Sequence, residues 1–429
     1  MVVAVLILIV ALVGCSGTPP PASEVVALQT IPAVTPRATV SPTVAPLLEP
    51  TALPPIMLSV WLPERFAPLD NTAAAALRAA WGRNFAAFAD NVTLEFRLKQ
   101  AADVGGIIQT LRTGALVAPS AMPDIVLLRR MDLVTAANIG LIQPLDATRV
   151  RSITEDFHSS VLGLGMIEEQ LYGLPYTVDV EHLALSPTAA EDTDWTFDAF
   201  LARGEPLLFP GTDANTLNKM FLAEYRAAAT PDGTPLPLDQ AALEQVLSFY
   251  ERALALNVIS AEVLEYTTSA DYMPLLLGQT PLSGVINSSE YLRLSPQAIA
   301  PIRYAPMPTA AGNAVTLLDG WVWVITTPDA GRQGAAIRFL NWLFDVERHH
   351  LYTEAIAAIP SGRTTLRQIA DPAYGLFVDS LVINATAPLN DAAGGVIGRA
   401  MQAALVSVLL GEKSAAAAAQ GVIDQLSAG

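Results

Sequence analysis

The stretch Ile56-Met57-Leu58-Ser59-Val60-Trp61-Leu62 opens the pattern that decides the fold. It is a short apolar run of the kind that forms a buried strand. A helix is expected next, because Asp70 or Asn71 can cap a segment whose apolar residues recur at helical spacing: Leu77, Trp81, Phe85 and Phe88. Strand patterns return at 92–98, where apolar and polar residues alternate, and at 124–128. This alternation of strands and helices predicts an α/β fold with a parallel, doubly wound sheet.

The remainder of the chain is expected to be mostly helical, with one further strand. Asp239 can open an amphipathic helix that ends near Asn257. A strand pattern returns at 320–325, and a helix is expected from about 329 to 344. In open parallel sheets, ligands bind beyond the carboxyl ends of the strands. The segments that directly follow the early strands are therefore the first place to look for a binding site.

Composition excludes several classes of protein. The 429 residues are 52% apolar and 15% charged, which is unlike a disordered chain. After the N-terminus no run of about 18 apolar residues occurs, so no membrane-spanning helix is expected there. The net charge of −17 and the presence of only three lysines argue against nucleic acid and anionic lipid surfaces as partners. A single cysteine, Cys15, rules out a disulfide framework and a cysteine-based metal site.

The N-terminus has the features of an export signal. Residues 2–13 are apolar without a break, and Leu12-Val13-Gly14-Cys15 resembles a bacterial lipobox. We therefore expect a signal peptide at 1–14, lipidation of Cys15 and a tether up to residue 55, since ten prolines in 16–55 favour an extended chain. The resemblance implies a location on the outer face of a cell membrane. The alternative is an ordinary buried helix or an uncleaved anchor.

Short stretches distributed over the body of the chain carry a family resemblance. They are Met122-Pro123-Asp124-Ile125-Val126, Gly140-Leu141-Ile142-Gln143-Pro144-Leu145-Asp146, Leu171-Tyr172-Gly173-Leu174-Pro175-Tyr176, Trp195-Thr196-Phe197-Asp198-Ala199-Phe200, Gly320-Trp321, Ala335-Ala336-Ile337-Arg338-Phe339-Leu340-Asn341-Trp342-Leu343 and Ile359-Pro360-Ser361-Gly362-Arg363. In this order they resemble the extracellular solute-binding proteins of sugar ABC importers, the group that includes maltose-binding protein. The resemblance covers nearly all of 56–429. One departure is Leu185-Ser186-Pro187, where the family usually has Tyr-Asn.

The resemblance implies an α/β protein with a two-lobe, periplasmic-binding-protein type II-like architecture. Each lobe would be a doubly wound sheet flanked by helices, with a hinge between the lobes. We expect the first lobe at 56–178 plus about 301–348, and the second at about 179–300 plus 349–429.

The resemblance also implies a function without catalysis. The protein would be the lipid-anchored substrate-binding component of an ABC importer. Hinge closure would capture a sugar or oligosaccharide, and the transmembrane subunits of a permease would receive it. A monomer without a cofactor or metal is expected.

The expected ligand-binding residues lie at strand ends or where strands cross between the lobes. Sugar recognition combines aromatic ring faces with carboxylate, amide and guanidinium groups. The candidates are Trp61, Glu64, Arg129, Tyr176, Asp179, Glu181, Asn287, Asp319, Trp321, Trp323 and Arg363. Trp321 and Trp323 share one face of a strand, so one can lie in the core and the other in the cleft. Core packing of Trp61, a hinge role for Tyr176 and an ion-pair or capping role for Arg363 are the structural alternatives.

Two other functions remain open at this point. A cleft rich in acids without arginine would favour a polyamine or another cation, whereas Arg129 and Arg363 in the cleft would favour a sugar. An enzyme acting on an extracellular glycan would need a pair of catalytic carboxylates. Glu168-Glu169 and Glu191-Asp192 are adjacent acidic pairs, which occur more often on solvated surface loops.

Overall fold

The computed structural model describes residues 54–67, 71–89, 91–101, 105–190, 194–211, 218–229, 238–294, 301–386 and 391–427, with side chains described from 395 in the last range. The chain divides into the units Met1–Thr51 and Ala52–Gly429, and only the second is described below. The expected signal peptide, Cys15 and the tether up to residue 53 lie outside the described residues. Within the described part of the chain, no helix has the length and apolar character needed to cross a membrane.

The first lobe is built on the parallel strands that the sequence predicts. These are β1 (Ile56–Pro63), β2 (Val92–Lys99) and β3 (Ile125–Arg129), with β1 in the middle. The helix α1 (Thr72–Phe88) begins as expected, because the Asn71 side chain accepts a hydrogen bond from the Ala74 amide. A fourth strand, β10 (Leu318–Ile325), joins the sheet antiparallel to β3. The predicted parallel α/β arrangement is therefore confirmed for the first three strands.

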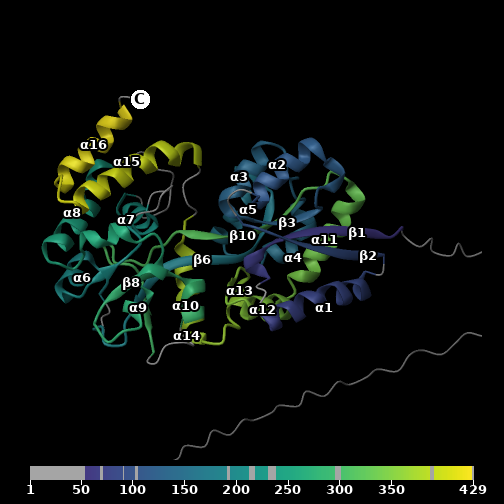
Figure 1. Ribbon diagram of the computed structural model, residues 1–429, viewed down its shortest axis with the longest axis horizontal. Coiled ribbons are helices and arrows are strands. Elements are labelled where there is room, and N and C mark those ends of the chain that lie inside the picture. The colour runs from purple at the N-terminus through teal and green to yellow at the C-terminus, as the bar shows by residue number, and fades with distance from the viewer. Residues whose placement is uncertain are drawn as a thin grey trace, which may run out of the picture. The chain divides into compact units, whose positions relative to one another are not determined.

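One strand is shared by the two lobes. The 13-residue β6 (Gly173–Leu185) pairs through its first half with β10 and β11 (Ile359–Pro360). Its second half pairs with β8 (Ser283–Asn287) and β9 (Arg303–Ala305). Figure 1 shows β6 extending from the first-lobe elements to the second-lobe elements. With β7 (Leu207–Leu208) beyond β8, the order is β2-β1-β3-β10-β6-β8-β7.

Helices cover both parts of this sheet. Those packed with the first lobe are α1, α2 (Ile107–Val117), α3 (Arg130–Asn138), α4 (Arg151–Thr154), α5 (Ser159–Gly165), α11 (Ala330–Leu343), α12 (Val346–Ala355) and α13 (Arg363–Leu366). The helix α14 (Pro372–Asn384) contacts both lobes, through Asp379 with His158 and through Tyr374 with Tyr291. Those of the second lobe are α6 (Phe197–Arg203), α7 (Lys219–Ala229), α8 (Gln240–Ala255), α9 (Met273–Leu276), α10 (Ser288–Leu294), α15 (Asp391–Leu409) and α16 (Ala415–Ser427). A small hairpin joins β4 (Met166–Ile167) to β5 (Gln170–Leu171). The expected two-lobe α/β architecture is confirmed.

The packing gives different lobe boundaries from those expected. The sequence analysis places 349–429 in the second lobe, but the Tyr352 ring of α12 lies 4.2 Å from that of Trp81 in α1. Only two residues separate α11 from α12, which is too short a connection to reach the other lobe. In the opposite sense, β9 lies within the expected first-lobe range of 301–348 but pairs with the second-lobe half of β6. We therefore propose that α12 and α13 belong to the first lobe, whereas α14 lies against both lobes, because Asp379 contacts His158 directly before α5 and Tyr374 stacks on Tyr291 of α10.

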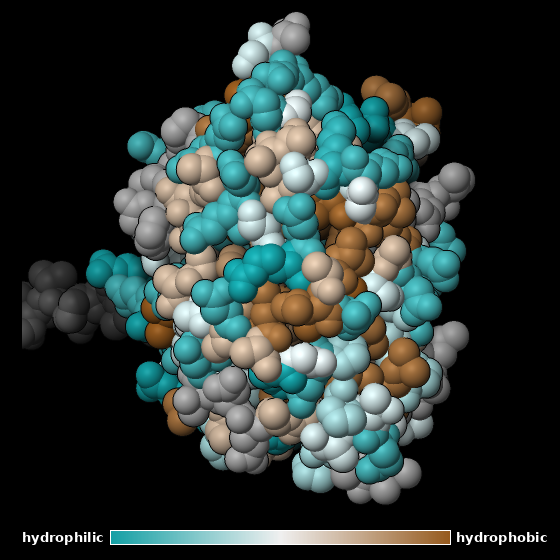
Figure 2. Space-filling view, turned by 90° about the vertical axis from the view of Figure 1, so that its left-hand side faces the viewer, coloured by the Kyte–Doolittle hydropathy of each residue, from teal (hydrophilic) through white to brown (hydrophobic). Residues whose placement is uncertain are grey.

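The apolar excess of the sequence is only partly buried. Residues such as Leu405 and Val422 form a second-lobe core together with α8. Several large apolar side chains nevertheless remain exposed, including Phe88, which the sequence placed on a buried stripe and which is 64% exposed. Figure 2 shows an area of apolar residues among hydrophilic ones on the face that carries the second lobe. Exposed apolar surface is ordinary for folded proteins and identifies no partner.

Candidate functional site

The hinge strands bring together four of the predicted site residues. On antiparallel β6 and β10, Asp179 lies opposite Asp319, and on β6 and β8, Glu181 lies opposite Asn287. Residues two apart on a strand, and residues directly opposite each other, share one face of a sheet. The four side chains therefore occupy the same face where the lobes meet, a region we call the lobe junction. Trp321 follows Asp319 by two residues and lies opposite Arg129 of β3.

Close backbone approach at the crossing explains the glycine between Asp319 and Trp321. A Cβ atom on Gly320 would lie 2.4 Å from the carbonyl oxygen of Thr177, which is shorter than any allowed contact. β10 and β6 can therefore lie this close only because position 320 has no side chain. The glycine of the motif Gly320-Trp321 thus lets β10 lie close to β6, and Asp319 lies at this crossing.

Asp179 is held by the start of α10. Its carboxylate accepts hydrogen bonds from the Ser288 hydroxyl at 2.8 Å, the Ser289 amide at 2.9 Å and the Ser289 hydroxyl at 2.7 Å. The Asn287 side-chain oxygen accepts from the Ser289 hydroxyl and from the Glu290 amide. The sequence analysis missed both serines, although a Ser-Ser pair directly after a strand is a usable signal for a helix start.

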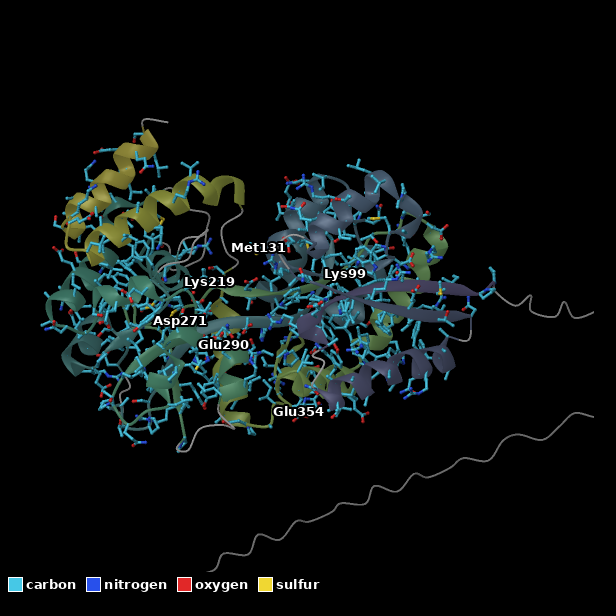
Figure 3. All side chains as sticks on the ribbon, in the orientation of Figure 1. Lys99, Met131, Lys219, Asp271, Glu290 and Glu354 are labelled. Atoms are coloured by element: carbon cyan, nitrogen blue, oxygen red, sulfur yellow. The ribbon has the colours of Figure 1, made fainter. Side chains whose placement is uncertain are left out.

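Lys219 is a second residue that the sequence analysis missed. It begins α7 in the second lobe, and its Nζ atom lies 3.4 Å from Oδ2 of Asp319. Burial acts to lower the pKa of Lys219, but the surrounding carboxylates, Asp319 foremost, outweigh it and raise that pKa above its ordinary value. Both partners remain accessible, with 40% and 36% of their side-chain surface exposed. Figure 3 shows Lys219 and Glu290 among the second-lobe elements, and Met131 and Lys99 among those of the first lobe.

Arg65 extends the junction on the first-lobe side. It lies in the turn Glu64–Phe66 that follows β1, and its guanidinium carbon is 5.4 Å from the ring centroid of Trp321. Burial lowers the pKa of Arg65, while Asp179 and Asp319 act in the opposite direction. The guanidinium group of Arg65 therefore interacts electrostatically with the carboxylates of Asp179 and Asp319, although Arg65 itself belongs to the first lobe. Glu64, the predicted residue beside it, is exposed.

Other predicted first-lobe residues are engaged within their own lobe. Trp61 is 4% exposed, and the Nζ atom of Lys99 lies 4.6 Å from its ring centroid. Arg129 forms an ion pair with Asp132, with 2.9 Å between Nε and Oδ2. These groups lie near the carboxyl ends of the parallel strands, as predicted, but each already has a partner within the first lobe.

Three predicted residues lie away from the junction. Tyr176 and Trp323 are both 0% exposed and pack against each other in the core, contrary to the expectation for Tyr176. Tyr176 is an odd number of residues from Asp179 and Glu181, so the alternation of the strand does not place it on their face. Arg363 donates hydrogen bonds to the carbonyl oxygens of Asp156 and Glu155 and therefore holds a first-lobe loop.

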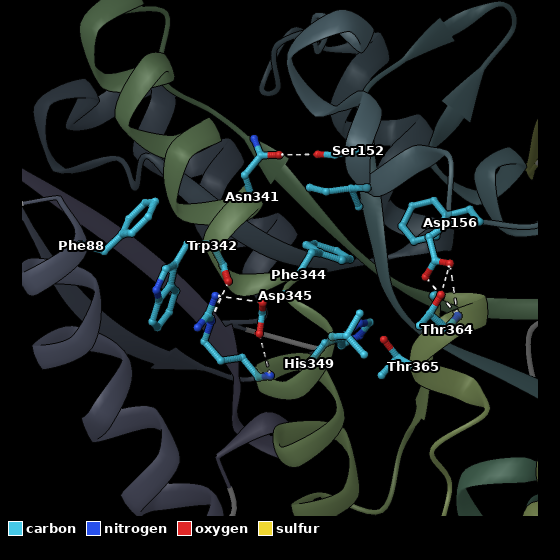
Figure 4. Close-up of a pocket in the computed structure, with 15 residues that line it drawn as sticks. Phe88, Ser152, Asp156, Asn341, Trp342, Phe344, Asp345, His349, Thr364 and Thr365 are labelled. Atoms are coloured by element: carbon cyan, nitrogen blue, oxygen red, sulfur yellow. Dashed lines mark hydrogen bonds and ion pairs between the residues drawn. The ribbon is translucent and has the colours of Figure 1, made fainter. Parts of the chain in front are cut away.

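Two cavities lie elsewhere in the described part of the chain. A pocket of 510 Å³ in the first lobe is lined by residues of α4, α11, α12 and α13, and Figure 4 shows Asp345 and Asp156 on opposite sides of it. Another, of 690 Å³, lies beside α6 and α8 in the second lobe. Neither is lined by a residue of the lobe junction. The adjacent acids Glu168 and Glu169 form an exposed turn of the small hairpin, while Glu191 and Asp192 lie outside the described residues.

The fold agrees with comparisons to known proteins. A cyclic α-maltosyl-1,6-maltose binding protein from Arthrobacter globiformis superposes with a TM-score of 0.69 at 17% identity, covering 87% of this chain and 98% of its own. The sugar-binding protein MalE of Xanthomonas citri gives 0.68 at 16% identity, covering 86% and 95%. Maltose-bound T. maritima MalE3 gives 0.64 at 13% identity, covering 86% and 99%. These similarities show that the chain shares the two-lobe α/β fold of these proteins.

The sequence itself identifies the family. The profile of the bacterial extracellular solute-binding proteins matches residues 82–375, and the chain belongs to that family. No curated protein sequence matches it.

Proposed function

We propose that this protein is the substrate-binding component of an ABC importer and that it captures a sugar or oligosaccharide at the lobe junction. The observation that carries the proposal is the convergence of hinge carboxylates, Lys219 and Arg65 on the strands shared by the lobes. Such a set offers both hydrogen-bond donors and acceptors, as a polyhydroxylated ring requires. Several structurally similar proteins are named for binding maltose or related saccharides, which supports the same ligand class.

Hinge closure would complete the site. Because Asp179 and Glu181 lie on β6, which belongs to both lobes, a small rotation about this strand brings first-lobe groups towards second-lobe groups. A solute that contacts both lobes stabilises the closed form by its differential affinity for that form. The closed form would then deliver the solute to the permease.

A ligand screen tests this function. Thermal unfolding and tryptophan emission of the purified protein would be followed against maltose, longer maltooligosaccharides, polyols and polyamines. A ligand at 100 times its dissociation constant should stabilise the protein by about 2.7 kcal/mol. A shift with saccharides supports the proposal. A shift with polyamines alone would instead assign the junction carboxylates to a cationic solute.

We also propose that the protein is lipid-anchored through Cys15 on the outer face of the membrane. The support is the lipobox-like sequence before Cys15 and the proline-rich segment after it. Replacing Cys15 by Ser should move the protein from the membrane fraction to the soluble fraction. Membrane retention of the Cys15→Ser variant would contradict lipidation at this residue.

A further inference from the structure

The first-lobe cavity contains polar groups for which no described residue is a partner. It has a volume of 510 Å³ and is lined by residues of α4, α11, α12 and α13, away from the lobe junction. This volume is in the usual range of small-molecule sites. Two of its lining side chains, His349 of α12 and Thr365 of α13, are each only 1% exposed. Figure 4 shows both among the side chains around the cavity, together with Trp342 and Phe344.

The imidazole ring of His349 offers a hydrogen-bond acceptor to this cavity. Its Nε2 atom lies 2.7 Å from the carbonyl oxygen of Tyr176, which can only accept, so Nε2 carries a proton. Burial lowers the pKa of His349 to about 4, so the ring is neutral at pH 7 and Nδ1 has a free lone pair. No described group donates to Nδ1, and this atom is not enclosed by protein atoms. Nδ1 is therefore open to the cavity that the ring lines.

The hydroxyl group of Thr365 is the second group without a partner. It forms no hydrogen bond with a described residue, and its oxygen is likewise not enclosed by protein atoms. A Cβ atom on Gly362 would lie 3.4 Å from this oxygen, so the glycine leaves it uncovered. Buried polar side chains nearly always have a hydrogen-bond partner, and a bound molecule can supply one. The cavity therefore offers such a molecule both an acceptor and a hydroxyl group.

The other lining groups restrict the chemistry of that molecule. Trp342 and Phe344 provide aromatic surface. Two carboxylates, those of Asp156 and Asp345, lie on opposite sides of the cavity (Figure 4). The lining cation, Arg348, is already engaged, because its guanidinium carbon lies 4.4 Å from the Trp342 ring centroid and its Nε–H donates to the Trp342 carbonyl oxygen. Such a lining disfavours anions and favours an uncharged, planar ring.

We propose that this cavity is a second small-molecule site and that it takes a planar heteroaromatic compound carrying an N–H donor. The N–H group donates to Nδ1 of His349, a ring nitrogen accepts from the Thr365 hydroxyl, and the ring packs against the aromatic side chains. The inference goes beyond the proposed function and does not depend on it, since no residue of the lobe junction lines this cavity.

Benzimidazole and N-methylbenzimidazole test the proposal on the full chain, because the methyl group removes the N–H donor. Magnetic resonance of protein with isotope-labelled histidine follows the Nδ1 signal of His349, which the variant His349→Gln assigns. We expect benzimidazole to shift this signal to saturation with a dissociation constant of about 1 mM or lower. N-methylbenzimidazole should bind about tenfold more weakly, because it leaves Nδ1 without a donor.

The variant Thr365→Val tests the second contact without depending on the histidine. It should weaken benzimidazole binding about fivefold. Its stability in denaturant unfolding should not fall below that of the wild type, because the hydroxyl group has no partner in the described structure. Thr267→Val, at an exposed position of the second lobe, is the matched control and should bind benzimidazole as the wild type does.

The outcomes decide the proposal independently of the carbohydrate function. Absence of a saturable shift with benzimidazole would reject the site. Equal affinity for the two compounds, or undiminished affinity in Thr365→Val, would reject the contacts assigned to the ligand and with them its class. The ligand screen tests solute binding at the lobe junction separately, so either proposal can fail while the other holds.

Discussion

Two regions of the strand β6 differ in the polarity of their surroundings. Around Tyr176 the strand is packed among aromatic rings, and His349 stacks on the tyrosine with 4.6 Å between ring centroids. Five residues later, Glu181 lies among carboxylates and Lys219. The first region is part of a lobe core, whereas the second lies where the lobes meet. The comparison indicates that residues of one strand can differ in function. Which side chains of β6 a solute can reach depends on the face of the sheet that each occupies and on the elements packed against it.

The largest expected effect comes from truncation of Tyr176, which tests whether this residue belongs to the core. We expect Tyr176→Ala to destabilise the protein by about 3–5 kcal/mol, because a buried aromatic ring would leave a cavity. Denaturant unfolding measures the loss. Tyr176→Phe is the control and should stay within about 1 kcal/mol of the wild type, since the hydroxyl group has no hydrogen-bond partner in the described structure. A stable Tyr176→Ala variant with weakened solute binding would instead return Tyr176 to the site.

The second prediction uses the pH dependence of the same core. His349 is 1% exposed, and burial lowers its pKa to about 4, although its Nε2–H donates to the Tyr176 carbonyl at 2.7 Å and Asp156 acts to raise the pKa. The unfolded chain therefore binds more protons than the folded protein between about pH 6.5 and pH 4, and stability falls as the pH falls through that window. The full difference for this group is about 3 kcal/mol.

Variants isolate this contribution from other titrating groups. His349→Gln should flatten the pH dependence of the free energy of unfolding between pH 7 and 4, when compared with the wild type by urea unfolding. Glu347→Gln, at an exposed position of the same helix, should retain the wild-type slope. An unchanged slope in His349→Gln would show that His349 is not held neutral by the core.

Much of the fold could be predicted from the sequence because it depends on local patterns. The apolar runs of β1 and β3, the alternation in β2 and the cap at Asn71 are all visible in short windows. The crossing strand is visible too, as its motif ends at Tyr176. The lobe of α12, which we propose differs from the expected one, could not be predicted in this way, because the sequence of the helix alone does not show which core its aromatic residues join.

The site was predicted less completely because it depends on contacts across long sequence separations. Asp179 and Glu181 were candidates from the crossing strand, Asp319 from the start of the returning strand and Asn287 from a polar loop, and the structure brings the four to one face. Lys219, by contrast, is 100 residues from its partner Asp319. Tyr176 was a candidate from its motif, although its odd spacing from Asp179 and Glu181 puts it out of step with them on the strand.

The smallest expected effect concerns Arg363, which tests whether a first-lobe residue away from the junction contributes to solute binding. The sequence placed it in the site, but its guanidinium group holds the loop at Glu155 and Asp156 through backbone carbonyls. Arg363→Gln should therefore lower stability by about 1 kcal/mol and leave the affinity for any solute that responds in the screen within about twofold. Asp179→Asn, at the junction, is the comparison variant and should weaken the same solute about tenfold. Calorimetry on both variants decides the matter, and a tenfold loss in Arg363→Gln alone would move the binding site towards the first-lobe loop.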